Sequence, residues 1–261
     1  MRLQKSTKGP GRFILCAFCA FLWLLSTVSF AQDLTPAQLE IQKQQQRLSS
    51  SDAEERRDAI MRLGSMRLAA ASRAVLPALK DVAPIVRATA AKAILSLEPE
   101  ESAGYLLPLL TDKDEFVRRE TAYALGKTHS RSVISALSER LLNDKENGVR
   151  GAAAIALGQI ADEAAVVPLV QTLEQKRKPN VFVLRAAAAA LGEIKSRAGT
   201  AALVSALSNE KFDSDVRREA ARSLGLIGDP SATSALKAAS TSADPYLSQI
   251  AYEALQKLSR G

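Results

Sequence analysis

The apolar and polar positions of this chain repeat in a nine-residue frame that begins at an arginine and ends in leucine-glycine. Two clear copies are residues 118–126, RRETAYALG, and residues 217–225, RREAARSLG. Frames begin at positions 56, 87, 118, 150, 184, 217 and 248, so successive copies stand 31 to 34 residues apart. Self-similarity at such a period is the signature of an architecture built from repeated supersecondary units. The second copy carries Leu95 in place of glycine, the fifth begins at Leu184, and the last is a half-copy.

Within each copy the apolar residues are spaced as on one face of a helix. Val117, Thr121, Ala122 and Leu125 stand at i, i+4, i+5 and i+8, and the same spacing recurs in the copies at 150 and 217. This period predicts a short amphipathic helix. Because its apolar face is narrow and rich in alanine, we expect neighbouring helices to approach closely.

Residues that begin and end helices flank the copies. Four positions before the frame stand side chains that cap helix N-termini, and Pro84 and Pro245 suit the first helical turn. The glycines that close the frame tolerate the left-handed conformation that follows many helices, so we predict that the helices end there. The predicted caps are Asp52, Asp114, Glu146, Asn180, Asp213 and Asp244, and the predicted stops are Gly64, Gly126, Gly158, Gly192 and Gly225.

A second apolar segment, such as residues 106–110 or 166–170, fits between each glycine and the next cap. Pro77 and Pro108 stand inside this segment in the first two copies, and we expect them to kink or shorten those helices. No run of β-branched residues alternates as a strand would. A single hairpin cannot bury both of its faces, so the copies must stack. The sequence therefore predicts an all-α chain in which about six and a half hairpins over residues 52–258 form an α-solenoid, a right-handed superhelix.

The motif V-R-R-E-x-A-x-x-L-G at residues 117–126 and 216–225, with an aspartate four residues before its first arginine, resembles the HEAT-repeat superfamily. It is similar in particular to the short HEAT-like repeats named after phycobilisome lyases. The resemblance covers roughly residues 50–258 and implies an armadillo-type solenoid. It implies little about function, because one fold hosts many functions. Leu184 and Ala83 depart from the motif at the frame arginine and the cap acid.

Arginine and aspartate recur with the repeat. In four copies the frame arginine follows its cap acid by four residues, a spacing at which we expect a weak ion pair on the surface of the same helix. Asp81, Asp112 and Asp144 stand six residues before a frame arginine and are candidate partners between repeats. Charges that recur with the architecture stabilise it more often than they form a site. We therefore assign a structural role to Arg56, Arg87, Arg118, Arg150, Arg217, Asp52, Asp114, Asp213 and Asp244.

The first residues of the chain have the pattern of an export signal. Four basic residues stand within positions 1–12, residues 13–31 carry no charge, and this segment ends in Ser29-Phe30-Ala31. We predict a secretory signal peptide over residues 1–31, cleaved after Ala31. The alternative is an uncleaved signal anchor, since about 18 apolar residues can just span a bilayer. Either places the rest of the chain outside the cytoplasm, in the periplasm or the extracellular space. Residues 32–51 predict a polar helix, either a tether or a cap.

Removal of this leader changes the composition. Cys16 and Cys19 both lie within it, so the mature chain has no disulfide and no thiol chemistry. Four of the 35 basic residues and none of the 28 acidic residues precede position 32, which lowers the formal net charge from +7 to +3. That modest excess and the export signal both argue against nucleic-acid binding.

The residues that catalysis needs are missing. Deoxyhypusine hydroxylase resembles these repeats and binds two irons through repeated His-Glu pairs, whereas this chain has one histidine, His129, which we expect in an exposed turn. Phycobilin lyase subunits share the repeats, but they act on a cytoplasmic substrate. No Gly-rich phosphate loop and no nucleophile with a paired base is present. We predict no catalysis, no cofactor and no metal site; the alternative is a degenerate or unrecognised enzyme of the HEAT-like lyase or hydroxylase type.

With catalysis and nucleic-acid binding both disfavoured, the function that we predict is recognition of a protein partner. Solenoids present a long concave face, and we expect a monomer that binds a partner of unknown identity through its second helices. The extra residues of the longest interval carry Lys176, Arg177 and Lys178, which suggest a protruding basic loop; the alternative is a solvated loop with no role. The other candidate partner-binding residues are Arg73, Lys80, Tyr105, Arg131, Arg140 and Gln171.

Overall fold

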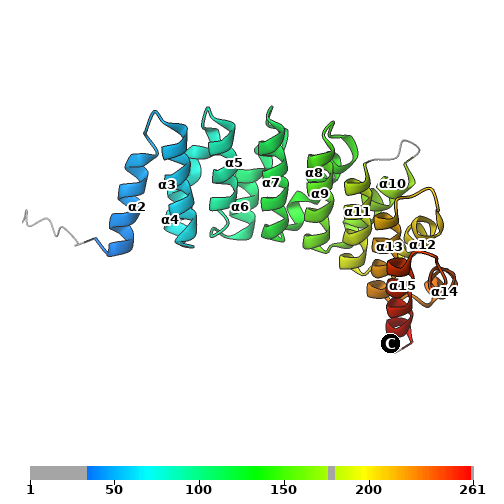
Figure 1. Ribbon diagram of the computed structural model, residues 1–261. Coiled ribbons are helices and arrows are strands. Elements are labelled where there is room, and N and C mark those ends of the chain that lie inside the picture. The colour runs from blue at the N-terminus through cyan, green and yellow to red at the C-terminus, as the bar shows by residue number, and fades with distance from the viewer. Residues whose placement is uncertain (1–33, 176–179, 260–261) are drawn as a thin grey trace, which may run out of the picture. The chain divides into compact units, whose positions relative to one another are not determined.

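The computed structural model describes residues 34–175 and 180–259, and every regular element in these ranges is a helix (Figure 1). The chain divides into two compact units, Met1–Leu39 and Glu40–Gly261. Helix α2 (Pro36–Arg47) begins in the first unit and ends in the second. All the other helices in the described residues belong to the second unit.

Helices alternate between a longer first helix and a shorter second helix. The first helices are α3 (Ala53–Ser65), α5 (Pro84–Ala93), α7 (Glu115–Thr128), α9 (Asn147–Ile160), α11 (Val181–Ile194), α13 (Ser214–Ile227) and α15 (Pro245–Leu258). The second helices are α4 (Ala69–Val75), α6 (Pro99–Leu106), α8 (Ile134–Asn143), α10 (Val166–Glu174), α12 (Thr200–Ser208) and α14 (Thr233–Ala239). Six pairs and a final unpaired helix follow one another in the described residues, which confirms the predicted all-α solenoid of about six and a half hairpins.

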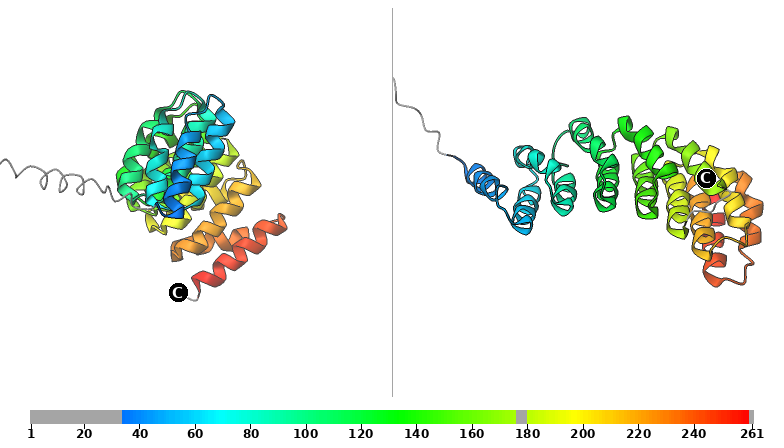
Figure 2. Two further views of the ribbon diagram at one scale, coloured as in Figure 1. Left: turned by 90° about the vertical axis from the view of Figure 1, so that its left-hand side faces the viewer. Right: turned by 90° about the horizontal axis from the view of Figure 1, so that it is seen from above.

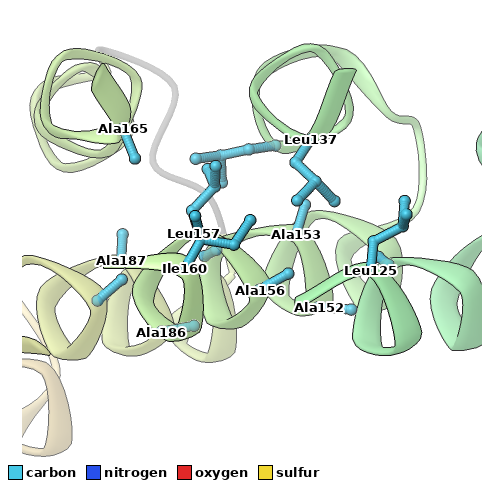
Figure 3. Packing of buried hydrophobic residues seen from close by; sticks show 14 of the residues in the cluster. Leu125, Leu137, Ala152, Ala153, Ala156, Leu157, Ile160, Ala165, Ala186 and Ala187 are labelled. Atoms are coloured by element: carbon cyan, nitrogen blue, oxygen red, sulfur yellow. The ribbon is translucent and has the colours of Figure 1, made fainter. Parts of the chain in front are cut away.

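The helices of this unit form two layers. Each first helix packs against the next first helix, and each second helix packs against the first helix of the following pair (Figure 2). The core lies between the layers: Leu125, Leu137 and Leu157 are fully buried there. Leu137 of α8 extends toward Ala153 of α9 (Figure 3). Neighbouring repeats therefore share one continuous core, as the narrow alanine-rich face predicts.

The predicted helix starts are confirmed. The side chains of Asp52, Asp114, Asn180, Asp213 and Asp244 each accept a hydrogen bond from a backbone N–H in the first turn that follows. These bonds satisfy donors that an uncapped helix leaves free. In the remaining two copies the capping position is occupied without such a bond: Glu146 makes none, and Ala83 is followed by Pro84 at the first helical position.

The predicted helix stops are wrong. Each frame glycine lies inside its helix, and the left-handed residues come later: His129, Ala161, Lys195 and Gly228 follow α7, α9, α11 and α13. The glycines serve close packing instead. A Cβ atom at Gly126 would lie 2.7 Å from the Cα atom of Ala156 in the next first helix. The glycine is needed because a neighbouring backbone occupies the space of a side chain.

The prolines of the first two second helices act as predicted. Helix α4 ends at Val75 and a 3-10 segment, η1 (Leu76–Lys80), contains Pro77. Helix α6 ends at Leu106 and η2 (Leu107–Thr111) contains Pro108 in the same way. In the four later pairs the 3-10 turn precedes the second helix, as η3 (Arg131–Val133) precedes α8. The surface of the first two pairs thus differs from that of the others.

Candidate interaction site

The recurring arginines pair between repeats. Arg56 donates from Nε and Nη2 to the two carboxylate oxygens of Asp81, both at 2.7 Å, and Nη1 donates to the backbone carbonyls of Ser50 and Ser51. Arg87 and Asp112 make the same pair at 2.7 and 2.8 Å, and Arg118 and Asp144 at 2.9 and 3.0 Å. We call these three pairs the Arg–Asp ladder. They confirm the partners expected between repeats.

The expected pairs within one helix are wrong. The caps Asp52 and Asp114 hydrogen-bond the backbone of the first turn, and their arginines turn to the ladder instead. A guanidinium group has five N–H donors in a fixed fork, so a buried arginine needs more acceptors than one exposed carboxylate supplies. A bidentate aspartate together with two carbonyls meets that need.

The ladder holds its aspartates in the charged form. The hydrogen bonds from Arg56 keep the pKa of Asp81 below its ordinary value. Burial by itself raises the pKa values of Asp112 and Asp144. The hydrogen bonds from Arg87 and Arg118, together with one backbone N–H donor to each carboxylate and the positive charge of the arginines, outweigh burial and leave both pKa values below the ordinary range. The charged groups of the ladder thus pair with one another.

The ladder ends at the fourth repeat. Arg150 finds no aspartate at the equivalent position; its Nη2 donates to Oε1 of Gln175 at 3.0 Å and its Nε to the carbonyl of Leu141. Because no carboxylate pairs with Arg150, burial lowers the pKa of its guanidinium below the ordinary value. Arg217 donates to the carbonyl of Leu207. Neither arginine therefore pairs with its cap acid.

At the last helix a different arginine pairs with an aspartate. Arg218 donates to both oxygens of Asp244 at 3.0 and 3.1 Å and lies over the ring of Tyr246. This pair was not predicted from the sequence, because Arg218 follows the frame arginine by one position. The spacing of 26 residues between the partners, shared by Arg118 and Asp144, is the signal that identifies it.

Three of the predicted partner-binding residues lie together. Arg73, Lys80 and Tyr105 line one groove of about 810 Å³ between the second helices of the first two pairs. We call this groove 1. Its apolar walls are Leu76, Pro77 and Leu79 from one pair with Tyr105, Gly104, Pro108 and Leu109 from the other, and Arg87 and Asp112 of the ladder complete it. This volume is within the range of ordinary ligand-binding clefts, about 300–1,000 Å³.

Two more predicted residues line a second groove on the same layer. Arg131 and Gln171 lie with Ile134, Val167 and Pro168 between α8 and α10. Arg131 is held there by Asp162, with 2.8 Å between Nε and the carboxylate. This groove is about 720 Å³.

The other predicted positions lie elsewhere. Arg140 lines neither groove, and its guanidinium lies 3.6 Å from the carboxylate of Asp144, beside the ladder. Lys176, Arg177 and Lys178 fall outside the described residues, as does the leader with its cleavage position after Ala31. His129 is exposed in the turn after α7, as predicted.

Neither a metal cage nor a membrane span occurs in the part of the chain that the structure describes. No three His, Cys, Asp or Glu side chains in residues 34–175 and 180–259 are grouped to hold an ion. Within the same ranges no helix has the length and apolar character needed to cross a bilayer.

Comparisons with known proteins identify the repeat. The family model for HEAT repeats matches residues 41–126, 105–181 and 167–256. A search of curated protein sequences finds no match. Among solved structures, YibA of E. coli is 21% identical, with a TM-score of 0.61 and coverage of 86% of this chain and 82% of that one. The complex of CpcE and CpcF of phycocyanin lyase from Nostoc sp. PCC7120 is 24% identical, with a TM-score of 0.53 and coverage of 89% and 94%. An engineered protein is also 24% identical, with a TM-score of 0.54 and coverage of 85% and 68%. At these identities the similarity shows the fold alone.

Proposed function

Because this chain belongs to the HEAT-repeat family, we propose that it is an exported, non-catalytic scaffold that binds a protein partner through the layer of its second helices. Stacked repeats present a long surface that each repeat extends, and this is the property that repeat proteins use for recognition. Groove 1 is the observation that carries the proposal, since it is an apolar cleft on that layer and contains three of the predicted residues.

Exposed apolar side chains on the second helices support the same layer. Tyr105 on α6 is 43% exposed and Val167 on α10 is 63% exposed, and each lines one of the two grooves. Aromatic residues are enriched in protein interfaces because they bury much apolar area at little cost in side-chain entropy. Tyr105 therefore offers a partner a large apolar contact, and Val167 offers a smaller one.

The side chains for catalysis are sparse, which supports a binding role. The single histidine, His129, is exposed after α7, and both cysteines stand within residues 1–31. The ladder uses its arginines and aspartates for one another. Stoichiometric iron in the purified protein, or a reaction lost on removal of a metal, would contradict a non-catalytic role.

Site-specific photo-crosslinking in the native host tests the binding layer. A photoreactive amino acid at position 105 or 167 should capture a partner protein. The same group at Met61 of α3 or Tyr252 of α15, which are 54% and 55% exposed on first helices, is the matched control and should capture much less. Equal capture from both layers, or capture from the first helices only, would contradict the proposed binding layer.

The proposed export rests on residues 1–31 and has its own test. The N-terminal sequence of protein isolated from the host should begin at Gln32, and the protein should fractionate with the periplasm or the medium. A chain that begins at Met1 in the membrane fraction would establish the anchored form instead. A chain that begins at Met1 in the cytoplasm would contradict export.

A further inference from the structure

Groove 1 lies between two second helices that each end in a 3-10 segment at a proline, an arrangement that the other pairs in the described residues lack. Pro77 and Pro108 end α4 and α6 early, so both sides of the groove are 3-10 segments. Between them Gly104 of α6 lines the groove, and a Cβ atom there would meet nothing within 4 Å. Glycine in an exposed helix costs stability relative to alanine. Here its missing side chain leaves the groove open.

The groove offers apolar surface to an occupant. Pro77, Pro108 and Tyr105 are exposed, and Leu76 is half-buried, so their surfaces face water when the groove is empty. Leu79 and Leu109 are buried and form the floor. Burial of such surface stabilises a complex by roughly 25 cal/mol for each Å² removed from water. An occupant must therefore carry large apolar side chains.

The free charge of the groove is positive. Asp112 accepts from Arg87 with both oxygens and also from the backbone N–H of Asp114, so it is fully engaged. Arg73 donates to Glu101 at 3.0 Å at the exposed rim. Lys80 is exposed and, within residues 34–175 and 180–259, pairs with no carboxylate. A carboxylate on the occupant would complete this rim.

We propose that groove 1 binds a segment of a partner polypeptide in which large apolar side chains stand next to an aspartate or glutamate. This rests on the proposed function and deepens it, since it names the part of the second-helix layer and the chemistry of the partner. The apolar side chains lie over Leu79 and Leu109 between the two prolines. The carboxylate lies beside Lys80.

A lipid with a carboxylate fits the same charges less well. The walls of groove 1 include exposed residues of both pairs, and an acyl chain along them would stay in contact with water. Small-molecule sites usually bury most of their ligand. A polypeptide tolerates this exposure, because its backbone forms hydrogen bonds with water while its apolar side chains enter the groove.

Two substitutions close the groove or reverse its charge without touching the core. Gly104→Leu fills the space, and leucine is a good helix former at an exposed helical position. Gly104→Ala is its control, because one methyl group leaves most of the groove open. Lys80→Glu reverses the free charge, and Lys237→Glu on α14 is the matched reversal on the same layer outside the groove. Circular dichroism and thermal melting establish that all four variants fold.

Peptide selection tests the chemistry. A phage-displayed library of random dodecapeptides is panned on the purified chain, and enriched peptides are measured by fluorescence anisotropy. The expected peptides combine leucine or aromatic residues with an adjacent acid. Their affinity should fall at least about tenfold in Gly104→Leu and Lys80→Glu and stay within about twofold in the two controls. No enrichment, enrichment of basic peptides, or affinity that Gly104→Leu leaves unchanged would overturn the inference.

Two further measurements show whether a negative result contradicts the polypeptide occupant, the role of groove 1 or the scaffold function. A long-chain carboxylic acid in the native mass spectrum, absent from Gly104→Leu, would overturn the polypeptide occupant in favour of a lipid. Crosslinking from position 167 then separates this inference from the proposed function. Suppose that the chain binds no acidic apolar peptide, and that position 167 captures a partner equally well with and without Gly104→Leu. This result would overturn the proposed occupant of groove 1, but it would agree with the scaffold role. No partner from either layer overturns the scaffold role itself.

Discussion

The front of the repeat array, from α3 to α8, and the rear, from α9 to α15, join neighbouring repeats by different contacts. In the front, the three pairs of the Arg–Asp ladder connect one repeat to the next. In the rear, Gly158, Gly192 and Gly225 let first helices approach so closely that an added Cβ would lie 2.8 to 2.9 Å from the next helix's Cα. In the front, Gly64 is less crowded, with 3.2 Å to the Cα of Ala93, and only Gly126, which faces α9 of the rear, is as close, at 2.7 Å from the Cα of Ala156. The rear has one comparable ion pair, between Arg218 and Asp244 at the last helix. One repeat motif thus stabilises its stack mainly with ion pairs at the front and mainly with backbone contact at the rear, and α7 with α9 and α13 with α15 use both.

Helix length explains part of the difference. Helix α5 ends at Ala93, whereas α9, α11 and α13 continue past the frame glycine. At Leu95 the chain has already left the helix, so no neighbouring backbone requires a glycine there. The rear instead places a glycine against alanine or serine in each successive pair of first helices.

Breaking the most buried pair of the ladder should have the largest effect. Asp144→Ala leaves Arg118 with a buried charge and no carboxylate; the Asp144 side chain is only 2% exposed. We expect a loss of roughly 3–5 kcal/mol in the free energy of unfolding, the usual cost of removing one partner of a buried pair. Urea denaturation measures it. The control is Glu54→Ala, which removes the carboxylate that pairs with Arg57; this carboxylate is 67% exposed. We expect this variant to lose less than about 1 kcal/mol in the free energy of unfolding. Equal losses would contradict a special role for the ladder.

Adding one methyl group to a rear glycine should have the next largest effect. Gly158→Ala places a Cβ atom 2.8 Å from the Cα of Ala190, and α9 and α11 must separate to accept it. We expect a net loss of roughly 1–3 kcal/mol, typical of overpacking, despite the better helix propensity of alanine. The same substitution at Gly104, where nothing lies nearby, should instead stabilise by up to about 1 kcal/mol. Thermal melting compares the two, and the same sign for both would refute the packing explanation.

Acid should destabilise the front more than the rear. The three ladder aspartates have lowered pKa values in the folded state, so their stabilisation is complete above the unfolded-state pKa of about 3.9 and is lost as the pH falls through the folded values. In the rear, Asp229 and Asp244 behave alike, but burial and the charge of Glu219 raise the pKa of Glu193. Protonation of Glu193 therefore relieves a cost that is present at neutral pH.

Hydrogen exchange between pH 7 and pH 3 can follow this difference. Amides of α5 and α7 should lose protection at a higher pH than those of α11 and α13, after correction for the intrinsic exchange rate. In Asp144→Asn the pH dependence of α7 should weaken, because one of the titrating groups is gone. Simultaneous loss of protection along the whole array would indicate that the ladder does not set local stability.

The sequence predicted what depends on neighbours along the chain. Of the contacts between distant residues it predicted those that recur with the repeat, such as the Arg–Asp ladder, and missed most others. The caps Asp52 and Asp213 and the shortening at Pro77 follow from local backbone chemistry, and the structure confirms them. Gly126 was misinterpreted as a helix stop because glycine serves both left-handed turns and close packing, and only the position of Ala156 distinguishes them. Groove 1 was likewise predicted only as scattered residues, since its shape depends on two separate 3-10 segments that lie side by side.

Helix α15 differs from α13 in the side chains at two equivalent positions. In α13, Gly225 lies against Ala254 of α15, and Ala221, four residues earlier, is fully buried. In α15 the equivalent positions carry Tyr252, which is 55% exposed, and Gln256. A further first helix could not approach α15 closely over these side chains.

The smallest expected effect comes from extending the ladder by one step into the rear. Gln175 occupies the position held by Asp81, Asp112 and Asp144 in the preceding repeats and already hydrogen-bonds Arg150 at 3.0 Å. Gln175→Asp would place a carboxylate there, and hydrogen bonds between charged groups are stronger than those to a neutral amide. We expect a gain of about 1 kcal/mol in the free energy of unfolding at pH 7. Gln175→Asn, which has the same length without the charge, is the control and should give no gain. The gain should fade as the pH drops through the pKa of the new aspartate, because the protonated acid no longer attracts Arg150. Equal stability of the two variants at pH 7 would mean that burial of the carboxylate cancels the pairing, and that the front and rear differ because an ion pair contributes nothing at this position.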